Sequence, residues 1–202
     1  MKILIATGNA HKVEEISALL GDGFELVSLR AFPNIEMPEE TGQTMPENAR
    51  LKAEHCARES GLISLADDSG MEVDALNGAP GVLSARWIDG SDADRTRAIL
   101  EKMQNEENRF ARYRCAICVA FPNGETIETE ATCEGAIARE ARGENGFGYD
   151  PIFELTNKTG AQREYSGLTM AQVPAPIKAQ ISHRARALGR RTCKPFTGQA
   201  DH

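Results

Sequence analysis

The order of apolar and polar positions predicts alternating strands and helices in the first part of the chain. Apolar runs at residues 3–6 and 24–29 are typical of strands, whereas the apolar positions within residues 13–20 have helical spacing. A helix over that stretch would be capped by Asn9 and would end at Gly21. This alternation indicates an α/β protein.

A second helix and a buried strand are predicted next. Thr44-Met45-Pro46-Glu47 has the pattern of a capping box with proline in the first turn, and it opens a helix that runs to Gly61. The apolar run at residues 62–66 then predicts a strand. Further along, Asp92 or Asp94 could cap a third helix.

The second half of the chain predicts a long hairpin and a terminal helix. Strands are expected at residues 109–121 and 125–138, because the Asn-Gly pair between them is a strong hairpin signal. A helix is expected from residue 177 to about residue 191. Since no repeat, low-complexity tract or linker interrupts these elements, residues 1–202 are expected to form a single domain.

Composition and charge narrow the class of protein. Of the 202 residues, 41% are apolar, which is enough for a real core in one large domain. The formal net charge of −7 argues against nucleic acid as a partner, because such proteins carry basic patches. No run has the length of a membrane-spanning helix, and the N-terminus has no signal-peptide pattern, so no membrane partner is expected.

The five cysteines favour a reducing compartment, and a cytoplasmic location is expected. Their number is odd and they are widely spread, which does not suit a disulfide scaffold. Cys115 and Cys118 have the spacing of a zinc-binding pair, but residues three apart in a strand point to opposite faces. Buried thiols are therefore expected at both positions.

Asp67-Asp68-Ser69-Gly70 directly follows the apolar run at residues 62–66, at the expected end of a strand. Taken alone, its composition favours a turn, because Asp, Ser and Gly are the commonest turn residues. Two adjacent carboxylates also suit Mg²⁺, which takes one or two carboxylates together with substrate phosphates and water. The motifs elsewhere in the chain decide between these two interpretations.

Residues 7–12, Thr-Gly-Asn-Ala-His-Lys, lie between a predicted strand and a predicted helix. A helix N-terminus suits phosphate because it presents unpaired N–H groups and a partial positive charge. Gly8 would allow the backbone to approach a ligand closely, and Lys12 would add a full charge. The spacing is not that of a Walker A loop. The alternative is an ordinary capped helix with an exposed lysine.

A third cluster combines a proline-flanked loop with the helix that follows it. Glu40 lies in the loop, while Asn48 and Lys52 share one face of the helix. Carboxylates in such loops are usually just solvated. If this helix face meets the Asp67-Asp68 strand end, the carboxylates and Lys52 would surround one volume that can hold Mg²⁺ and a triphosphate.

The glycine-rich segment at residues 143–151 carries two aromatic residues, Phe147 and Tyr149. Aromatic rings in a polar loop are a reasonable platform for stacking a base, and Asp150 could accept a ring N–H. The alternative is that both rings fold over the core.

The predicted terminal helix carries several basic residues. Lys178, Ser182 and Arg186 would share one face, with His183 and Arg184 near it. Such a face is normally only solvated. Beside a nucleotide, however, Lys178 and Arg184 could donate to a keto oxygen of the base.

Seven stretches of the chain closely resemble, in order and spacing, the inosine triphosphate pyrophosphatase family. They lie between residues 7 and 184, nearly the whole chain. They are Thr7-Gly8-Asn9-x-x-Lys12, Glu40-Thr41-Gly42-x-Thr44, Glu47-Asn48-Ala49-x-x-Lys52-Ala53, Ala66-Asp67-Asp68-Ser69-Gly70, Gly78-Ala79-Pro80-Gly81, Gly146-Phe147-Gly148-Tyr149-Asp150-Pro151-x-Phe153 and Ser182-His183-Arg184.

The resemblance implies an activity, a cofactor and a fold. Members of the family hydrolyse inosine, deoxyinosine and xanthosine triphosphates to the monophosphate and pyrophosphate, with Mg²⁺. The fold would be an elongated mixed β-sheet whose flanking helices form two lobes around an active-site cleft, usually in a homodimer. The expected partners are therefore a nucleoside triphosphate substrate and a second copy of the chain.

The resemblance also implies roles for individual residues. Glu40 and Asp68 would hold Mg²⁺, Asp68 would accept a proton from the attacking water, and Lys52 would contact phosphate. Residues 7–12 would bind the triphosphate, Ser69 would contact the substrate and the others would recognise the base. The substrate-binding set is Thr7, Gly8, Asn9, Ala10, His11, Lys12, Ser69, Phe147, Gly148, Tyr149, Asp150, Lys178, His183 and Arg184.

One segment departs from the family pattern, and two other functions stay open. Residues 168–178 are several residues longer than the usual connection to the base-contacting lysine, and they contain two prolines. A Maf-like pyrophosphatase for modified pyrimidines is one alternative. A nucleotide sensor without turnover is the other, although a sensor has no need of a water-activating carboxylate such as Asp68.

Overall fold

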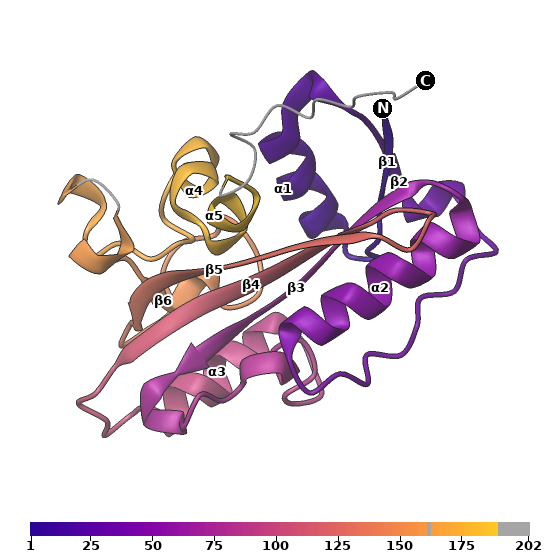
Figure 1. The fold of residues 1–202 in the computed structure, drawn as a ribbon. Helices are drawn as coiled ribbons and strands as arrows, with labels where there is room; N and C mark the ends of the chain where they lie inside the picture. Colours follow the sequence, from indigo (N-terminus) through magenta and orange to yellow (C-terminus); the bar gives the residue numbers. More distant parts are fainter. Residues whose placement is uncertain (161–162, 190–202) are drawn as a thin grey trace.

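The computed structural model describes residues 1–160 and 163–189, in which six strands form one mixed sheet in the order β2-β1-β3-β4-β5-β6 (Figure 1). The strands are β1 (Lys2–Ile5), β2 (Glu25–Ser28), β3 (Ile63–Val73), β4 (Phe110–Ala120), β5 (Thr126–Ile137) and β6 (Phe153–Glu154). The helices are α1 (Ala10–Leu20), α2 (Met45–Ser60), α3 (Asp92–Lys102), α4 (Ala175–Ile181) and α5 (His183–Gly189). The predicted α/β fold with an elongated mixed sheet is confirmed.

Strand β3 is longer than its parallel neighbour. Strands β1, β2 and β3 are parallel, and the β1–β3 pairing ends where Ile5 lies beside Leu65. On its other edge β3 is antiparallel to β4, and this pairing continues from Ser64 to Val73. Residues 67–70 therefore belong to a strand. The turn favoured by their composition is wrong, because β4 supplies backbone partners for the whole segment.

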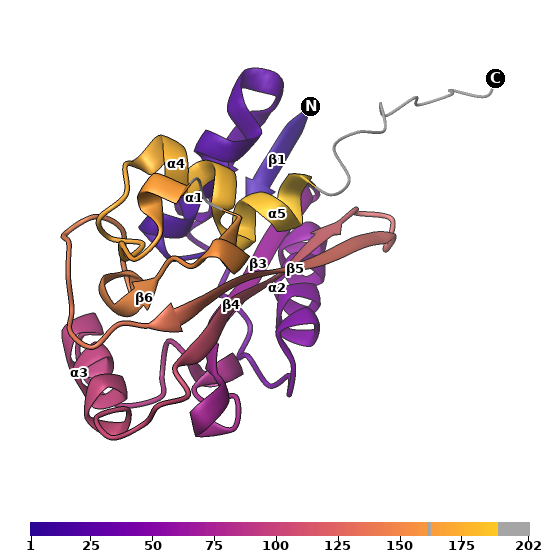
Figure 2. The same ribbon diagram turned by 90° about the vertical axis from the view of Figure 1, so that its left-hand side faces the viewer.

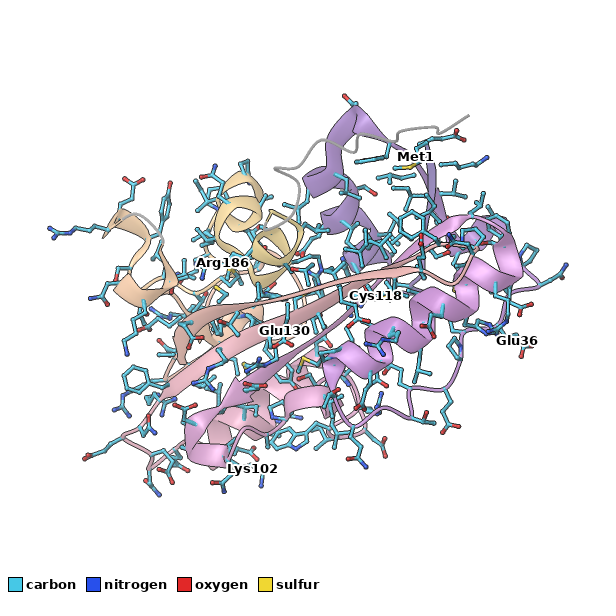
Figure 3. All side chains as sticks on the ribbon, viewed as in Figure 1. Met1, Glu36, Lys102, Cys118, Glu130 and Arg186 are labelled. Atoms are coloured by element: carbon cyan, nitrogen blue, oxygen red, sulfur yellow. The ribbon has the colours of Figure 1, made fainter. Side chains whose placement is uncertain are left out.

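Helices cover both faces of the sheet (Figures 1 and 2). Helix α2 lies along one face, against β3 and β4, while α5 packs on β4 and β5 from the other side together with α1 and α4. Cys118, which Figure 3 labels, packs with the α2 side. Cys115 packs on the opposite side, with Ile16 of α1 and Ala187 of α5. The prediction of buried thiols on opposite faces is thus confirmed; Cys193 lies outside the described residues.

Two of the predicted helix starts are confirmed and one is wrong. The Asn9 side chain accepts hydrogen bonds from the backbone of His11 and Lys12, and Thr44 closes the expected capping box. Helix α3 is capped by Ser91, not by Asp92 or Asp94. The reason is a reciprocal pair of bonds, since the Ser91 hydroxyl accepts from the Asp94 amide while the Asp94 carboxylate accepts from the Ser91 amide.

The predicted single terminal helix is two short helices. Ser182 is extended, with ψ 155°, and it separates α4 from α5. Its N–H still donates to the Lys178 carbonyl at 2.9 Å, and its Oγ accepts from the Ala185 amide at 3.2 Å. Lys178 and Arg186 therefore do not share a helix face, and the last residues of the prediction lie outside the described chain. None of the described helices has the length and apolar character needed to cross a bilayer.

Candidate active site

A cavity of about 490 Å³ opens between the residues that follow β1, the middle of β3, helices α1 and α2, and the segments after β5. It gathers residues from all the motifs that suggested chemistry. Of the predicted catalytic, metal-binding and substrate-binding residues, all except Ala10 line it: Thr7, Gly8, Asn9, His11, Lys12, Glu40, Lys52, Asp68, Ser69, Phe147, Gly148, Tyr149, Asp150, Lys178, His183 and Arg184.

The first group in the cavity centres on Lys52. Its buried Nζ donates to Glu40 Oε1 at 2.7 Å and to Asp68 Oδ1 at 3.0 Å. Asn48, one turn earlier in α2, places its Nδ2 3.4 Å from Asp68 Oδ2. Arg86 donates to Glu40 Oε2 at 2.5 Å. The predicted meeting of the α2 face with Asp68 is confirmed by these contacts.

The two carboxylates of this group have opposite pKa shifts. Burial raises the pKa of Asp68, and the attraction of Lys52 does not fully offset that effect. Burial also acts on Glu40, but its bonds to Lys52 and Arg86 outweigh it and lower the pKa of Glu40. The Asp68 carboxylate is therefore a stronger base than an ordinary aspartate.

The donor set suits a hard cation that is shared with a ligand. Glu40 and Asp68 offer carboxylate oxygens, and Lys52 already places one positive charge between them. Within the described residues, no group of three or more His, Cys, Asp and Glu side chains is arranged to hold a metal. Mg²⁺ commonly takes only one or two carboxylates and fills its shell with phosphate and water, so this pair fits it.

The second group is a buried chain of ion pairs. Arg184 donates to Asp67 Oδ2 at 2.8 Å from Nη2 and at 3.1 Å from Nε, and it also pairs with Glu15 of α1. Glu15 in turn lies 2.6 Å from Lys178 Nζ, which lies 2.6 Å from Asp150 Oδ2. This chain joins α1, β3, α4, α5 and the turn at Asp150.

The Asp67 carboxylate belongs to this series of ion pairs and does not line the cavity. Burial would raise its pKa, but Arg184 and Lys12 outweigh burial and hold the pKa of Asp67 well below its usual range. Lys12 Nζ lies 3.1 Å from Asp67 Oδ1. Arg184, which we expected to be free for a base, is already bonded to Asp67, Glu15 and Ser69.

Phe147 and Tyr149 have different environments. Phe147 is half-buried and stacks on His11, with ring centroids 5.1 Å apart and planes at 12°. Its amide donates to Asp150 Oδ2 at 2.9 Å, which fixes the loop. Tyr149 is buried, and its hydroxyl donates to the Ser84 carbonyl at 2.9 Å. The stacking platform is therefore available only at Phe147, whereas Tyr149 follows the alternative of a ring folded into the core.

His183 is buried against the ring of Tyr113, with centroids 4.6 Å apart. Burial and the positive charge of Arg184 lower the pKa of His183 well below its usual range. Tyr113 also donates its hydroxyl to Asp150 Oδ1 at 3.1 Å.

Sequence reasoning missed several residues in and around the site, among them Glu15, Tyr113 and Arg86. Glu15 follows Lys12 by three positions on the same helix, which could have placed it near the cavity. Tyr113 sits inside a long strand without any local signal, and Arg86 lies in an irregular segment. Their importance depends on contacts with residues far away in the sequence.

The cavity of this α/β protein combines a helix N-terminus, buried lysines and a pair of carboxylates. These features indicate a protein that binds a phosphorylated ligand. Comparison of the sequence with known protein families identifies the family. A model of the Ham1 family matches residues 3–191, and the chain belongs to that family.

Relatives and solved structures agree with this assignment. Two proteins named dITP/XTP pyrophosphatase, from Exiguobacterium sp. (strain AT1b) and Geobacillus kaustophilus, are each 47% identical to this chain. The alignments cover 93% of this chain in both cases, and 93% and 90% of the relatives. A solved HAM1 protein from Coxiella burnetii has 38% identity and a TM-score of 0.81, covering 93% of this chain and 94% of its own. The family resemblance carried by the seven sequence motifs is therefore confirmed.

Proposed function

We propose that this protein hydrolyses non-standard purine nucleoside triphosphates, those of inosine, deoxyinosine and xanthosine, to the monophosphate and pyrophosphate, and so removes them from the nucleotide pool. The observation that carries the proposal is the contact of Asp68 with Lys52 in the cavity that also contains the N-terminus of α1. A base and phosphate-binding groups thus lie together. The names of the relatives, dITP/XTP pyrophosphatases, point to the same substrates.

Asp68 is the proposed proton acceptor for the water that attacks the α-phosphate. Its raised pKa makes the carboxylate a better base. Lys52 holds the Asp68 carboxylate in place at 3.0 Å and offsets phosphate charge, as does Lys12 from the first turn of α1. Backbone N–H groups at the start of that helix would bind phosphate oxygens.

Mg²⁺ is the proposed cofactor, and Glu40 and Asp68 are the residues that would hold it. When bound, it would stabilise negative charge on the phosphate groups as a Lewis acid. The two carboxylates provide the oxygen ligands that this ion prefers.

The base is proposed to lie against Phe147, beside the ion pair of Lys178 and Asp150. Lys178 Nζ lies 5.0 Å from the centre of the Phe147 ring and is held by Asp150 and Glu15. A 6-keto base with an N1–H would accept from Lys178 and donate toward Asp150, whereas adenine presents the reverse pattern. Mismatched buried polar groups are costly, so this arrangement would reject adenine.

One assay distinguishes this proposal from the two alternatives. The protein is incubated with Mg²⁺ and a panel of nucleoside triphosphates, and the products are identified. We expect pyrophosphate from inosine triphosphate. A pyrimidine preference would favour the Maf-like enzyme, no turnover would favour the sensor, and orthophosphate as product would contradict the proposed chemistry.

Replacing Asp68 by asparagine tests the proposed base. Asp68→Asn keeps the size of the side chain but cannot accept the proton, so kcat should fall by about 10²- to 10⁴-fold. The measurement is pyrophosphate release at saturating inosine triphosphate. Asp22→Asn, an exposed residue after α1, is the control and should keep wild-type kcat. Equal rates for wild type and Asp68→Asn would remove Asp68 from this role.

We further infer one domain, a homodimer and a cytoplasmic location. The cavity is lined by residues from Thr7 to Arg184, which supports a single domain. The four described cysteines are buried and unpaired, which supports a reducing compartment. The dimer is tested by light scattering, where a mass of about twice the 22.0 kDa chain is expected and a mass of one chain would contradict it.

A further inference from the structure

The Glu40 side chain has both of its carboxylate oxygens occupied by cations. Oε1 accepts from Lys52 at 2.7 Å, and Oε2 accepts from Nη1 of Arg86 at 2.5 Å. Nη2 of Arg86 also lies 3.4 Å from the Glu40 carbonyl oxygen. None of the roles described above uses Arg86. We propose that Arg86 is a further phosphate-binding residue, which Glu40 holds in the free protein and releases to the pyrophosphate part of the substrate when a divalent cation binds Glu40.

The backbone that presents Arg86 is fixed beside the reacting carboxylate. Ser84 Oγ accepts from the Met71 amide at 2.9 Å and donates to the Gly81 carbonyl at 2.6 Å, and so attaches this segment to β3 just beyond Ser69 and Gly70. The Arg86 amide donates to the Leu83 carbonyl at 2.8 Å. Ser84 and Ala85 line the cavity itself. The root of the Arg86 side chain is therefore held next to Ala85, which lines the cavity.

The guanidinium, by contrast, is free to change its partner. The Arg86 side chain is 44% exposed, whereas the Lys52 side chain is only 7% exposed. An exposed ion pair contributes little to stability, so breaking it costs little. Arg86 can therefore exchange a carboxylate for a phosphate without any change in the backbone.

Charge balance gives a reason for the exchange. In the free protein, five carboxylates of the two ion-pair groups described above are matched by five cations: Glu15, Glu40, Asp67, Asp68 and Asp150 against Lys12, Lys52, Arg86, Lys178 and Arg184. A triphosphate carries more negative charge than one divalent cation neutralises. A cation that binds Glu40 replaces Arg86 there, and it thereby frees a positive charge for the phosphates.

The chemistry of arginine suits this second partner. Its planar guanidinium can donate two parallel hydrogen bonds to phosphate oxygens as well as to a carboxylate. Lys52, by contrast, is buried and donates to both Glu40 and Asp68, so it is held close to these two carboxylates. Arg86 is the exposed cation of the first group, and it is paired with a carboxylate that lines the cavity.

The proposal rests on the proposed function, and it is tested by binding measurements that need no turnover. Arg86→Gln removes the charge and keeps much of the side chain. We expect inorganic pyrophosphate, titrated with Mg²⁺ present, to bind Arg86→Gln about tenfold more weakly than wild type, because charged hydrogen bonds are lost. Inosine monophosphate should bind both proteins equally. Mn²⁺ alone should bind the variant severalfold more tightly, since Glu40 has lost a competitor.

Two results would overturn the proposal. One is equal binding of pyrophosphate to wild type and Arg86→Gln. The other is weaker binding of Mn²⁺ to the variant, which would mean that Arg86 only orients Glu40. Arg50→Gln is the matched control, because Arg50 forms an equally short pair with Glu128 at 2.5 Å and its side chain is 54% exposed. It should change neither titration.

Failure of the proposed function would look different. If wild-type protein released no pyrophosphate from inosine triphosphate, the proposed activity would be wrong. The Mn²⁺ and pyrophosphate titrations would still show whether Arg86 is exchanged between Glu40 and a phosphate. Thermal unfolding of both arginine variants establishes that they fold as wild type does.

Discussion

Asp67 and Asp68 are adjacent residues with opposite environments. Successive side chains of β3 point to opposite faces of the sheet, so Asp67 meets Arg184 of α5 while Asp68 meets Lys52 of α2. The pKa of Asp67 is lowered by its cations, whereas burial raises the pKa of Asp68. Although the two side chains are chemically identical, Asp67 thus forms a structural ion pair and Asp68 provides a basic carboxylate.

His183 predicts a pH dependence of stability. Burial holds its pKa well below 6.5, so the unfolded chain binds a proton that the folded chain does not bind as pH falls below about 6.5. Stability should therefore decrease on acidification, by up to about 1.4 kcal/mol per pH unit. Urea unfolding at pH 7.5 and 5.5 measures this change.

The comparison variant for this prediction is His183→Asn, which cannot take up the proton. The loss of stability between the two pH values should be smaller in His183→Asn than in wild type. His11→Gln is the control, because the His11 side chain is 60% exposed, and it should keep the wild-type loss. An equal loss in His183→Asn and wild type would show that His183 does not cause the effect.

At the scale of single elements, local sequence signals predicted most helices and strands. They failed where contacts with residues distant in the sequence determine where an element ends. Asn9 and Thr44 cap helices through bonds within a few residues, which sequence patterns can detect. The apolar run ends at Ala66, yet β3 continues because β4 pairs with it and buried cations balance its aspartates. The break at Ser182 likewise has no glycine or proline to announce it.

Gly70 offers a test of how tightly β3 is held. A Cβ at this position would overlap the Gly81 carbonyl oxygen and would lie 2.6 Å from Ser84 Oγ. Gly70→Ala should therefore lower the unfolding free energy by about 1–3 kcal/mol, as overpacking does. Thermal or urea unfolding measures the loss. Gly23→Ala, where a Cβ meets nothing within 4 Å, should leave stability nearly unchanged, and similar values for both variants would contradict the close approach.

At the scale of the whole molecule, the site is held together by contacts over long sequence distances. Arg184 and Asp67, which are 117 positions apart, are joined inside the protein, and Glu15 links them to Lys178. The sequence motifs placed nearly all the expected residues in one cavity. They could not predict that Arg184 is bonded within the protein, because that arrangement depends on Glu15 and on the path of α1.

Removing Arg184 should destabilise the whole protein. Arg184→Gln leaves the buried Asp67 carboxylate without its main cation, and breaking such a pair typically costs about 3–5 kcal/mol. Urea unfolding at neutral pH measures the effect. Arg58→Gln, at an ion pair with the neighbouring Glu59, should cost less than about 1 kcal/mol. A loss below that value in Arg184→Gln would mean that the pair contributes little.

The contact between His11 and Phe147 has a thermodynamic consequence for selectivity. Because Phe147 already has a planar partner in the free protein, a planar ligand that stacks on the same face of its ring must displace the imidazole of His11. The ligand exchanges one stacking interaction for another, so flat shape alone yields little net free energy. All purines are flat. Discrimination among them must then come from the hydrogen-bonding edge of the ring.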